Sequence, residues 1–325
     1  MIAKKLTICI PTYNRLAFLK KQINFIKSEV DENENLLQYI NFIVCDNSSE
    51  DGTDVFLQKL ELTHDFFDCH VNSENLGLIG NVVKLLSLSK TDFIWFLSDD
   101  DELEKGSLNS VISIISDNSS LNFIFLNFFV RGKRSFVPNT GLIANSKEVA
   151  IEIFNQSYGS LVLISSCVYK RENINNLKKH RFFSDLHSPL LYSFYCCSRG
   201  DIYISKMPLV NYRAGNASYA GLIRSVKYKF EGYVQILESS VDFGYGEKDV
   251  FSSIKKFMKN QSFSYVIYLF LNPRNAIYLV TTYFSLVEII LIPIYAIVNL
   301  FKACCAIFRS HYEMFKIREK EDHSM

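Results

Sequence analysis

The sequence predicts an α/β protein with a mostly parallel central sheet flanked by helices. Short apolar runs alternate with longer stretches of helical period through the N-terminal third of the chain, an order typical of parallel strands joined by helical crossovers. Polar residues follow directly after several of the apolar runs. The chain has 325 residues, of which 48% are hydrophobic and 14% aromatic, so it can bury a sizeable core.

The expected elements alternate between strand and helix. The strands are expected over Leu6 to Ile10, Ile40 to Cys45, Phe67 to Val71 and Phe93 to Leu97. The helices between them are expected over Leu16 to Glu29, Asp51 to Leu62 and Leu78 to Leu88. Because such crossovers are right-handed, the loops after the strands meet at one edge of the sheet, where open α/β sheets bind ligands.

The middle of the chain is less regular. It is expected to contain a helix over Ser107 to Ile115, an apolar strand over Phe123 to Val130, a basic turn-rich stretch over Arg131 to Asn139, an apolar helix over Leu190 to Cys197 and a strand over Asp201 to Ile204. No motif between residues 131 and 250 indicates a particular substrate.

Charge and cysteine content exclude some functions. Thirty-five Lys and Arg balance 34 Asp and Glu, so no global basic field attracts nucleic acid. The eight cysteines form no C-x-x-C pair and several lie in apolar runs, as reduced thiols in a cytoplasmic protein do. Met1 to Lys5 leads straight into a strand pattern, so we expect no secretory signal and a cytoplasmic N-terminal part.

The C-terminal part, residues 251 to 325, predicts a hydrophobic helical extension. Ser262 to Leu271 is apolar, and Ala276 to Phe301 is a run of 26 residues that contains Glu288 and Pro293. The run exceeds the ~20 apolar residues that a bilayer span needs. However, an unpaired Glu288 would cost roughly 3 kcal/mol there, and Pro293 would kink the helix. We expect residues 262 to 301 to associate with a membrane, either as a span or as a re-entrant or interfacial helix pair. A soluble core helix is the less favoured alternative.

A basic flank follows this apolar run, and such flanks stay on the cytoplasmic, anionic side of a membrane. It consists of Lys302, Arg309, Lys316, Arg318 and Lys320. The N-terminal part is also expected in the cytoplasm. A single span would put the two ends on opposite sides of the membrane, so a hairpin or in-plane arrangement is favoured.

The sharpest local signal is an acidic cluster, Ser98-Asp99-Asp100-Asp101-Glu102, directly after the fourth expected strand. Neighbouring carboxylates at the end of a buried strand cannot all ionise without a counter-charge. Oxygen ligands suit Mg²⁺ or Mn²⁺, which usually take one or two carboxylates together with substrate phosphates. An isolated acidic triplet would more often be a solvated turn that caps the helix at Ser107, but the apolar strand before it favours a cation site.

Two other polar loops are expected at the same edge of the sheet. Asp46 ends the second strand and precedes a turn rich in Asn and Ser. This turn can cap the next helix, and a carboxylate at a strand end can also accept a hydrogen bond from a pyrimidine ring N–H. Pro11-Thr12-Tyr13-Asn14-Arg15 follows the first strand. A helix start there offers N–H groups to phosphate, and Tyr13 offers a face on which a base can stack.

Four motifs in register resemble the family 2 glycosyltransferases, which have the GT-A fold. They are Ile8-Cys9-Ile10-Pro11-Thr12-Tyr13-Asn14-Arg15, Val44-Cys45-Asp46-Asn47-Ser48-Ser49-Glu50-Asp51-Gly52-Thr53, Asn75-Leu76-Gly77 with Asn81, and Phe96-Leu97-Ser98-Asp99-Asp100-Asp101. The resemblance covers about the first 130 residues, with order and spacing intact. It implies a GT-A glycosyltransferase domain over residues 1 to 250, with a nucleotide-sugar-binding half at 1 to 130 and an acceptor-side half at 131 to 250.

The resemblance also implies roles for individual residues. Those expected to bind the donor nucleotide are Pro11, Thr12, Tyr13, Arg15, Asp46, Asn75, Gly77, Asp99, Asp100 and Arg213. Asp46 would hydrogen-bond the base, while Asp99 or Asp100 would lie nearer the ribose. Asp101, with Asp99, would hold the metal ion, Mn²⁺ or Mg²⁺. Arg213 resembles a position near the diphosphate, although it could equally be a surface ion-pair partner.

Inverting members of the family use a base, placed well after the metal motif, to deprotonate the acceptor hydroxyl. The matching stretch is Arg181 to Pro189, and it lacks the usual Glu-Asp pair. Asp185 is the preferred candidate and His187 a close second. Each could instead be structural, Asp185 as a helix cap and His187 as a solvent-facing side chain.

The activity that the resemblance implies is inverting transfer of a sugar from a nucleotide-sugar donor to a glycan or polyprenyl-linked acceptor. Such an enzyme would serve surface-polysaccharide biosynthesis at the cytoplasmic face of the inner cell membrane. The alternatives are a nucleotidyltransferase of similar architecture and a non-catalytic membrane-bound relative. Nucleotidyltransferases usually carry a Gly-rich loop after the first strand, and Pro11 to Arg15 contains no glycine. The intact acidic cluster argues against a non-catalytic relative.

Overall fold

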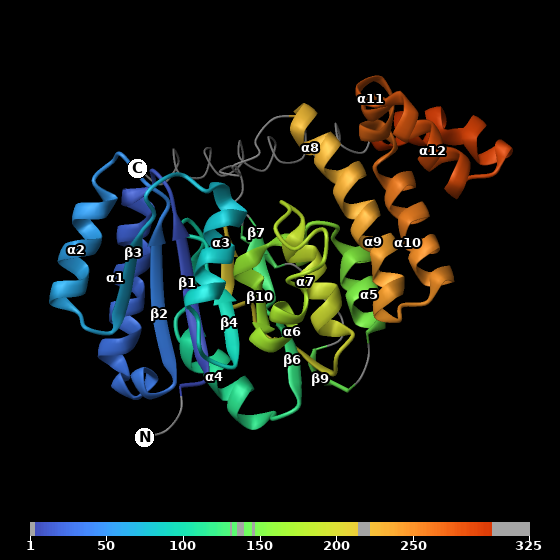
Figure 1. Cartoon of the computed structure of the whole chain (residues 1–325). Helices are drawn as coiled ribbons and strands as arrows, with labels where there is room; N and C mark the ends of the chain where they lie inside the picture. Colours follow the sequence, from blue (N-terminus) through green and yellow to red (C-terminus); the bar gives the residue numbers. More distant parts are fainter. Residues whose placement is uncertain (1–3, 131, 135–139, 145–146, 214–221, 301–325) are drawn as a thin grey trace, which may run out of the picture. The chain divides into compact units, whose positions relative to one another are not determined.

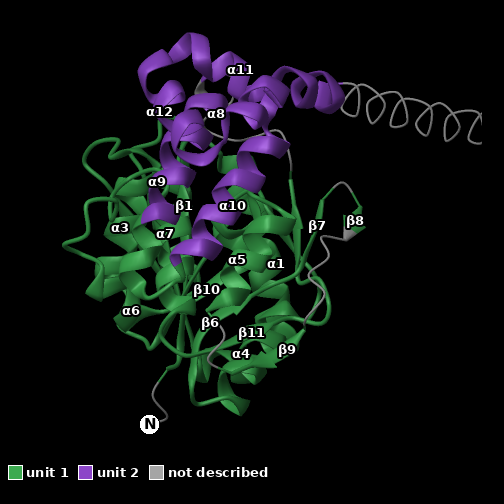
Figure 2. Ribbon diagram, turned by 90° about the vertical axis from the view of Figure 1, so that its right-hand side faces the viewer, with its two compact units in different colours: residues 1–218, 239–246 green, residues 219–238, 247–325 purple. Residues whose placement is uncertain are grey.

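The computed structural model describes residues 4–130, 132–134, 140–144, 147–213 and 222–300. The basic flank expected after residue 301 and most of the basic stretch at Arg131 to Asn139 lie outside these residues. The chain forms two compact units (Figure 2): unit 1 is residues 1–218 with 239–246, and unit 2 is residues 219–238 with 247–325. The functional division expected at residue 250 stays a prediction.

Unit 1 is built on an eight-stranded sheet in the order β3-β2-β1-β4-β10-β6-β11-β9 (Figure 1). Its strands are β1 Leu6–Thr12, β2 Ile40–Asp46, β3 Phe67–Val71, β4 Phe93–Phe96, β6 Leu121–Phe125, β9 Gly141–Ile143, β10 Cys167–Lys170 and β11 Asp201–Ile204. The half made of β1 to β4 is parallel throughout, whereas β10 and β9 run antiparallel to their neighbours. The predicted α/β class and the first four strands are confirmed.

Helices cover the sheet because its central strands are apolar on both faces. Every residue of β1 and β4 is buried, the pattern of strands sandwiched between helical layers. The helices of unit 1 are α1 Leu16–Glu32, α2 Thr53–Thr63, α3 Gly77–Leu88, α4 Ser107–Asp117, α5 Glu148–Gln156, α6 Arg171–Asn176 and α7 Ser188–Cys197. The helices predicted between the first four strands are confirmed to within three residues at each end.

The single strand predicted over Phe123 to Val130 is wrong. The chain leaves the large sheet after β6, and β7 Phe128–Val130 joins a second sheet in the order β5-β12-β7-β8. The other strands there are β5 Glu102–Leu103, β8 Lys133–Arg134 and β12 Val210–Tyr212. The break falls at Asn127, which is fully buried and whose backbone N–H donates to the Ser205 hydroxyl at 2.8 Å. A buried polar residue must find partners, and these lie outside the ladder of the large sheet.

Unit 2 is helical. Its elements are α8 Leu222–Tyr228, the π-helical turn Lys229–Tyr233, α9 Val234–Ser240, α10 Glu247–Asn260, α11 Ser262–Leu271, α12 Pro273–Tyr283 and the helix Leu286–Leu300. Residues 239 and 240, the end of α9, belong to unit 1. Aromatic rings form the core of unit 2: Phe230 stacks on Tyr268 at 5.1 Å between centroids and meets Tyr265 edge-on at 5.6 Å.

The apolar run at Ala276 to Phe301 is not one continuous helix. It breaks at Phe284 and Ser285 and bends by 118° between α12 and Leu286–Leu300. The Ser285 N–H and hydroxyl both donate to Glu288 Oε2 at 3.1 Å; the N–H bond is the carboxylate half of a capping box, at the start of a new helix. Within the described residues, no single helix has the length and apolar character of a membrane span.

Asp51 joins the starts of two helices to one carboxylate. Its Oδ2 accepts from the Leu16 N–H at 2.8 Å, and its Oδ1 accepts from the N–H and hydroxyl of Thr53 at 3.2 and 2.6 Å. Burial raises the pKa of Asp51, but these hydrogen bonds together outweigh it and lower the pKa. The side chain thus caps α1 and α2 at once.

We expect Asp51→Ala to destabilise unit 1 by about 1–2 kcal/mol, because two helix starts lose a capping acceptor. Glu61→Ala, at an exposed position of α2, is the matched control and should change stability by less than about 0.5 kcal/mol. Urea unfolding followed by circular dichroism measures both. Equal midpoints for the two variants would show that the Asp51 caps contribute little.

Candidate active site

The acidic cluster after β4 is held by the loop that follows β1. Asp99 is 4% exposed, and its Oδ2 accepts from the Thr12 hydroxyl at 2.7 Å. Arg15 Nη1 lies 3.3 Å from Asp99 Oδ1 and 3.0 Å from Asp100 Oδ2. The structure therefore brings together two of the loops that the sequence placed at this edge of the sheet.

Asp101 is held by two segments that are distant in sequence. It is 2% exposed; its Oδ2 accepts from the Ser165 hydroxyl at 2.6 Å, and its Oδ1 accepts from the Arg213 backbone N–H at 3.1 Å. Ser165 is fixed in turn, because its carbonyl accepts from the Trp95 indole at 2.8 Å and its hydroxyl accepts from the Ser98 N–H at 3.0 Å. Sequence analysis did not identify Ser165; the only signal is a pair of serines in an apolar run.

The alternative that the acidic residues cap the helix at Ser107 is wrong. That helix starts after Gly106, whose N–H donates to Glu29 Oε1 at 2.9 Å, and the Ser107 N–H donates to the Glu104 carbonyl at 3.0 Å. Asp99 and Asp101 point into the protein instead.

Burial raises the pKa of both Asp99 and Asp101 to about 6. The Thr12 hydroxyl and Arg15 oppose the rise at Asp99, and the Ser165 hydroxyl and the Arg213 N–H oppose it at Asp101. Desolvation still dominates, as it does for carboxyls in low-dielectric surroundings. The charge of Asp100 adds to the rise in pKa at both residues, and the charge of Asp99 adds to it at Asp101. A cation beside them would favour their ionised forms.

Asp46 lies at the same edge of the sheet. Its side chain is fully buried and accepts from the Ser49 N–H at 3.1 Å and from the Ser49 hydroxyl. The next residue, Asn47, donates its backbone N–H to the Thr12 carbonyl at 2.9 Å. Because Thr12 also contacts Asp99, the loops after β1, β2 and β4 form one continuous structure.

A network of asparagines shapes the segment expected to line the nucleobase pocket. The Asn47 amide donates to Asn75 Oδ1 at 2.7 Å and to the Gly77 carbonyl at 3.2 Å, and its Oδ1 accepts from the Leu76 N–H at 2.9 Å. Asn72 donates to Asn47 Oδ1 at 3.1 Å. Sequence analysis missed Asn47 and Asn72 as organisers of this loop, although both directly follow strands.

Two non-glycine residues of these loops adopt positive φ, at 52° for Asn14 and 67° for Ser48. The loops interlock there: the Asn14 N–H donates to Ser49 Oγ at 2.8 Å, and Asn14 Oδ1 accepts from the Glu50 N–H at 2.8 Å. Such backbone conformations persist only where surrounding contacts hold them, and they cluster at functional sites.

Three other predicted donor-site residues differ in environment. Pro11 is buried at the end of β1, whereas Tyr13 is 42% exposed and so presents its ring to solvent. The Arg213 guanidinium lies 5.3 Å from the centre of the Phe18 ring and 3.5 Å from Glu102 Oε1. Its contact with Asp101 is through the backbone N–H, and a role of its side chain at the diphosphate stays a prediction.

Asp185 and His187 form a pair at the start of α7. The His187 ring Nδ1 and the His187 backbone N–H, at 2.9 Å, both contact Asp185 Oδ1. The His187 side chain is only 11% exposed, whereas that of Asp185 is 41% exposed. His187 therefore does not face open solvent. Which of the two acts as a base stays a prediction.

The residues present fit a cation that is shared with a substrate phosphate. Among the residues that the structure describes, no three His, Cys, Asp or Glu side chains converge as a closed metal site. Asp99 and Asp101 nevertheless offer buried carboxylate oxygens, each of which has capacity for a second interaction. A cation with few protein ligands is the usual arrangement for Mg²⁺ at phosphates.

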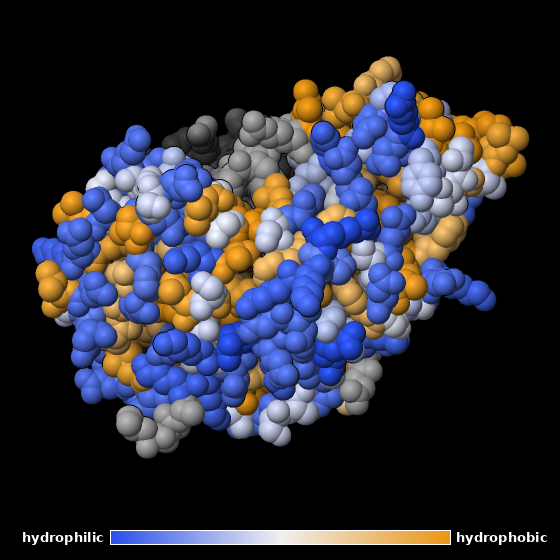
Figure 3. All heavy atoms as spheres, in the orientation of Figure 1, coloured by the Kyte–Doolittle hydropathy of each residue, from blue (hydrophilic) through white to orange (hydrophobic). Residues whose placement is uncertain are grey.

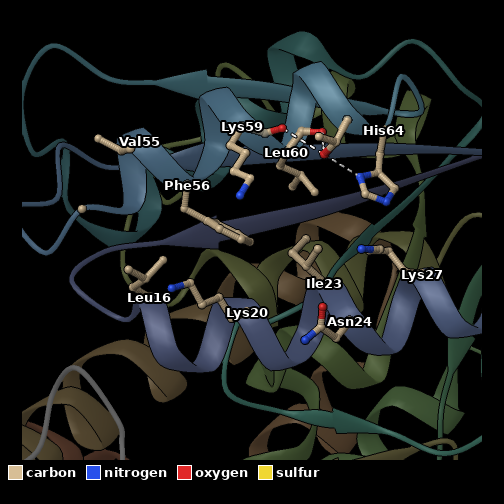
Figure 4. A pocket seen from close by; sticks show the side chains of 12 residues that line it. Leu16, Lys20, Ile23, Asn24, Lys27, Val55, Phe56, Lys59, Leu60 and His64 are labelled. Atoms are coloured by element: carbon tan, nitrogen blue, oxygen red, sulfur yellow. Dashed lines mark hydrogen bonds between the residues drawn. The ribbon is translucent and has the colours of Figure 1, made fainter.

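A groove between α1 and α2 lies apart from these residues (Figure 4). It has a volume of about 560 Å³ and is lined by Leu16, Lys20, Ile23, Asn24, Lys27, Gly52, Val55, Phe56, Lys59, Leu60, Thr63 and His64. None of these is among the predicted donor-site residues, so the groove supports no part of the donor assignment.

We expect acidification to stabilise the metal-free protein through Asp99 and Asp101. Their pKa is about 6 in the folded protein against 3.8 for an ordinary Asp carboxyl, so their contribution to stability is present below pH 3.8 and is lost as pH rises through about 6. In EDTA, the difference in Tm between wild type and Asp101→Asn should therefore shift in favour of wild type when the pH is lowered from about 7 to about 5. Thermal scans of both proteins test this, and identical pH profiles would contradict it.

Comparison with known proteins shows which family model and which relatives this chain matches. The model described as Glycosyl transferase family 2 matches residues 7–174, which is more than half of the 325 residues. Abequosyltransferase RfbV of Salmonella typhimurium is 34% identical over 104 residues, 32% of this chain and 30% of its own. A Campylobacter jejuni GalNAc(5)-diNAcBac-PP-undecaprenol beta-1,3-glucosyltransferase is 31% identical over 109 residues, 33% of each chain. The match thus spans about a third of the length of these curated relatives.

Solved structures show the same fold. Residues 1–349 of S. aureus TarS in complex with UDP-GlcNAc superpose with a TM-score of 0.56 at 15% identity, covering 82% of this chain and 76% of that one. The mannosyltransferase PcManGT from Pyrobaculum calidifontis, in complex with GDP-Man and Mn²⁺, superposes with a TM-score of 0.51 at 14% identity, covering 92% and 83%. At these identities the likeness concerns the fold, which is the GT-A fold.

Proposed function

The chain belongs to glycosyl transferase family 2, and from this we propose that it transfers a sugar from a nucleoside diphosphate donor to an acceptor hydroxyl with inversion at the anomeric carbon. The observation that carries the proposal is the burial of Asp99 and Asp101 at the sheet edge, in contact with Thr12, Ser165 and the Arg213 N–H. Such oxygen-rich, partly neutralised sites suit a diphosphate bound with a cation.

The donor nucleoside would lie over the interlocked loops after β1 and β2. Asp46 retains acceptor capacity for a base N–H, because a carboxylate accepts more bonds than Ser49 supplies. Tyr13 offers an exposed ring for stacking. The TarS complex holds UDP-GlcNAc and the PcManGT complex holds GDP-Man, so the fold accommodates both pyrimidine and purine donors.

Asp101, with Asp99, would hold Mn²⁺ or Mg²⁺. When bound, such a cation neutralises the charge that develops on the leaving nucleoside diphosphate. The residues of the chain keep that site in place: Ser165 and the Arg213 N–H orient Asp101, and Thr12 and Arg15 orient Asp99. Because these donors are already positioned, little reorganisation accompanies transfer.

Asp185 is proposed as the base that takes the acceptor proton. It is the more exposed member of the pair, and the His187 ring contacts its Oδ1 and so orients the carboxylate. Attack by the deprotonated oxygen on the face opposite the leaving group inverts the anomeric centre. His187 would be a positioning residue under this assignment.

The acceptor is proposed to be a glycan on a polyprenyl diphosphate, at the cytoplasmic face of the cell membrane. The name of the Campylobacter jejuni relative includes a PP-undecaprenol acceptor. The exposed apolar residues of unit 2, such as Phe270 and Ile290, are consistent with work at a membrane. We propose that the enzyme acts in surface-polysaccharide synthesis.

We expect binding of UDP or GDP to require Mn²⁺ or Mg²⁺, because the local cations do not neutralise a diphosphate beside three aspartates. Asp101→Asn should weaken metal-supported binding by at least about tenfold, whereas Asp65→Asn, at an exposed loop position, should leave it unchanged. Titration calorimetry with and without EDTA provides the measurement. Metal-independent binding of equal strength would refute the proposed cation site.

We expect Asp185→Asn to lower the transfer rate by about 100-fold or more while donor binding persists, because general-base catalysis is lost. His187→Ala should lower it less, since the carboxylate remains. Release of free nucleoside diphosphate from a panel of nucleotide sugars, with a polyprenyl-linked acceptor, reports the rate. An active Asp185→Asn together with an inactive His187→Ala would make His187 the base.

A further inference from the structure

The helix Leu286–Leu300 turns its polar residues Glu288 and Asn299 toward the protein and leaves aliphatic residues exposed, whereas a helix of a water-soluble protein turns its polar residues outward. A row of aliphatic side chains at helical spacing points away from the protein, with exposures between 43% and 75%. The row consists of Leu286, Val287, Ile290, Ile294, Ile297 and Val298.

The polar side chains of the same helix bind the protein instead. Glu288 lies 2.8 Å from Lys255 Nζ and 3.0 Å from Lys259 Nζ, both on α10. The Asn299 amide donates to the carbonyls of Lys259 and Asn260 at 2.9 and 3.2 Å, at the end of α10. The helix thus uses its polar residues for attachment and presents hydrocarbon outward.

The exposed apolar surface continues over the two preceding helices. Phe270 of α11 is 81% exposed, and Ile277 and Tyr278 of α12 are 55% and 54% exposed. Figure 3 shows hydrophobic atoms gathered over α11 and α12. Soluble proteins rarely leave a contiguous apolar surface of this extent uncovered.

The geometry of these helices does not suit a span. At a rise of 1.5 Å per residue, Leu286–Leu300 is about 22 Å long and α12 about 16 Å, and each is shorter than the ~30 Å hydrocarbon core of a bilayer. The bend of 118° between them prevents their lengths from adding. The hydrogen bonds from Ser285 to the Glu288 carboxylate and the two lysines on Glu288 hold that bend.

We propose that α11, α12 and Leu286–Leu300 form an in-plane anchor that enters only one leaflet of a lipid bilayer, with the aliphatic row at the hydrocarbon boundary. This inference deepens the proposed work at a membrane and rests on it. The row is made of Leu, Ile and Val, whereas protein interfaces favour Trp, Tyr and Arg. The composition therefore favours lipid over a second copy of the chain as the partner.

The test uses the full-length protein and phosphatidylcholine vesicles that contain some phosphatidylglycerol. Wild type should float with the vesicles. Ile290→Asn/Ile294→Asn/Ile297→Asn should weaken partition into the vesicles by at least about 100-fold, because three isoleucines that enter the hydrocarbon in the proposed anchor are lost. The matched control Leu62→Asn/Met207→Asn changes residues of unit 1 that are 88% and 66% exposed and should float as wild type does.

Topology distinguishes an in-plane anchor from a span. In sealed inside-out vesicles from expressing cells, protease should remove tags from both ends of the chain. Protection of the C-terminal tag, flotation of the triple variant, or a soluble wild-type dimer that the triple variant splits into monomers would each overturn the proposal. Metal-supported binding of UDP or GDP is measured on the same proteins. If none of them, wild type included, binds either nucleotide, the result would instead count against the proposed transferase activity.

Discussion

The active-site edge depends on burying two carboxylates, Asp99 and Asp101, at the end of β4. Buried charges require partners, and here the partners come from both strands that flank β4. Thr12 ends β1, and Ser165 lies just before β10. The site therefore depends on the register at the centre of the large sheet, because a slip of either neighbouring strand would remove one hydrogen-bond donor from a buried carboxylate.

The second sheet supplies the remaining partner of Asp101. The break at Asn127 takes β7 out of the large sheet, and β7 then pairs with β12. On its other side β12 pairs with β5, with Val210 opposite Leu103 and Asn211 opposite Glu102. Continuing that antiparallel register would place Tyr212 opposite Asp101, and the N–H of the next residue, Arg213, donates to the Asp101 carboxylate. The apparent irregularity in the apolar run is thus what completes the acidic cluster.

The part of unit 1 from β1 to β4 was predictable because its signals are local. Periodicity located β1 to β4 and α1 to α3, and the rule that parallel strands share one edge brought Asp46 and Asp99 together. The partners of Asp101 were not predictable in this way. The backbone N–H of Arg213 carries no side-chain signature, and the role of Ser165 depends on pairing between segments more than 60 residues apart. The break at Asn127 likewise depends on a distant partner, Ser205.

The effect of Glu288 on membrane contact depends on its partners in the structure. In the sequence it is a costly charge near the middle of an apolar run. In the structure it caps the start of a helix and binds two lysines, so the charge faces protein while Ile290 and Ile294 face outward. A carboxylate satisfied in this manner would not oppose contact with lipid in the proposed anchor, because the bilayer would meet only hydrocarbon. Confining an enzyme to the surface where a lipid-linked acceptor resides raises their effective concentration without any new contact between them. If the proposed anchor and acceptor hold, the ion pairs of Glu288 would connect a local capping motif to the encounter between enzyme and acceptor.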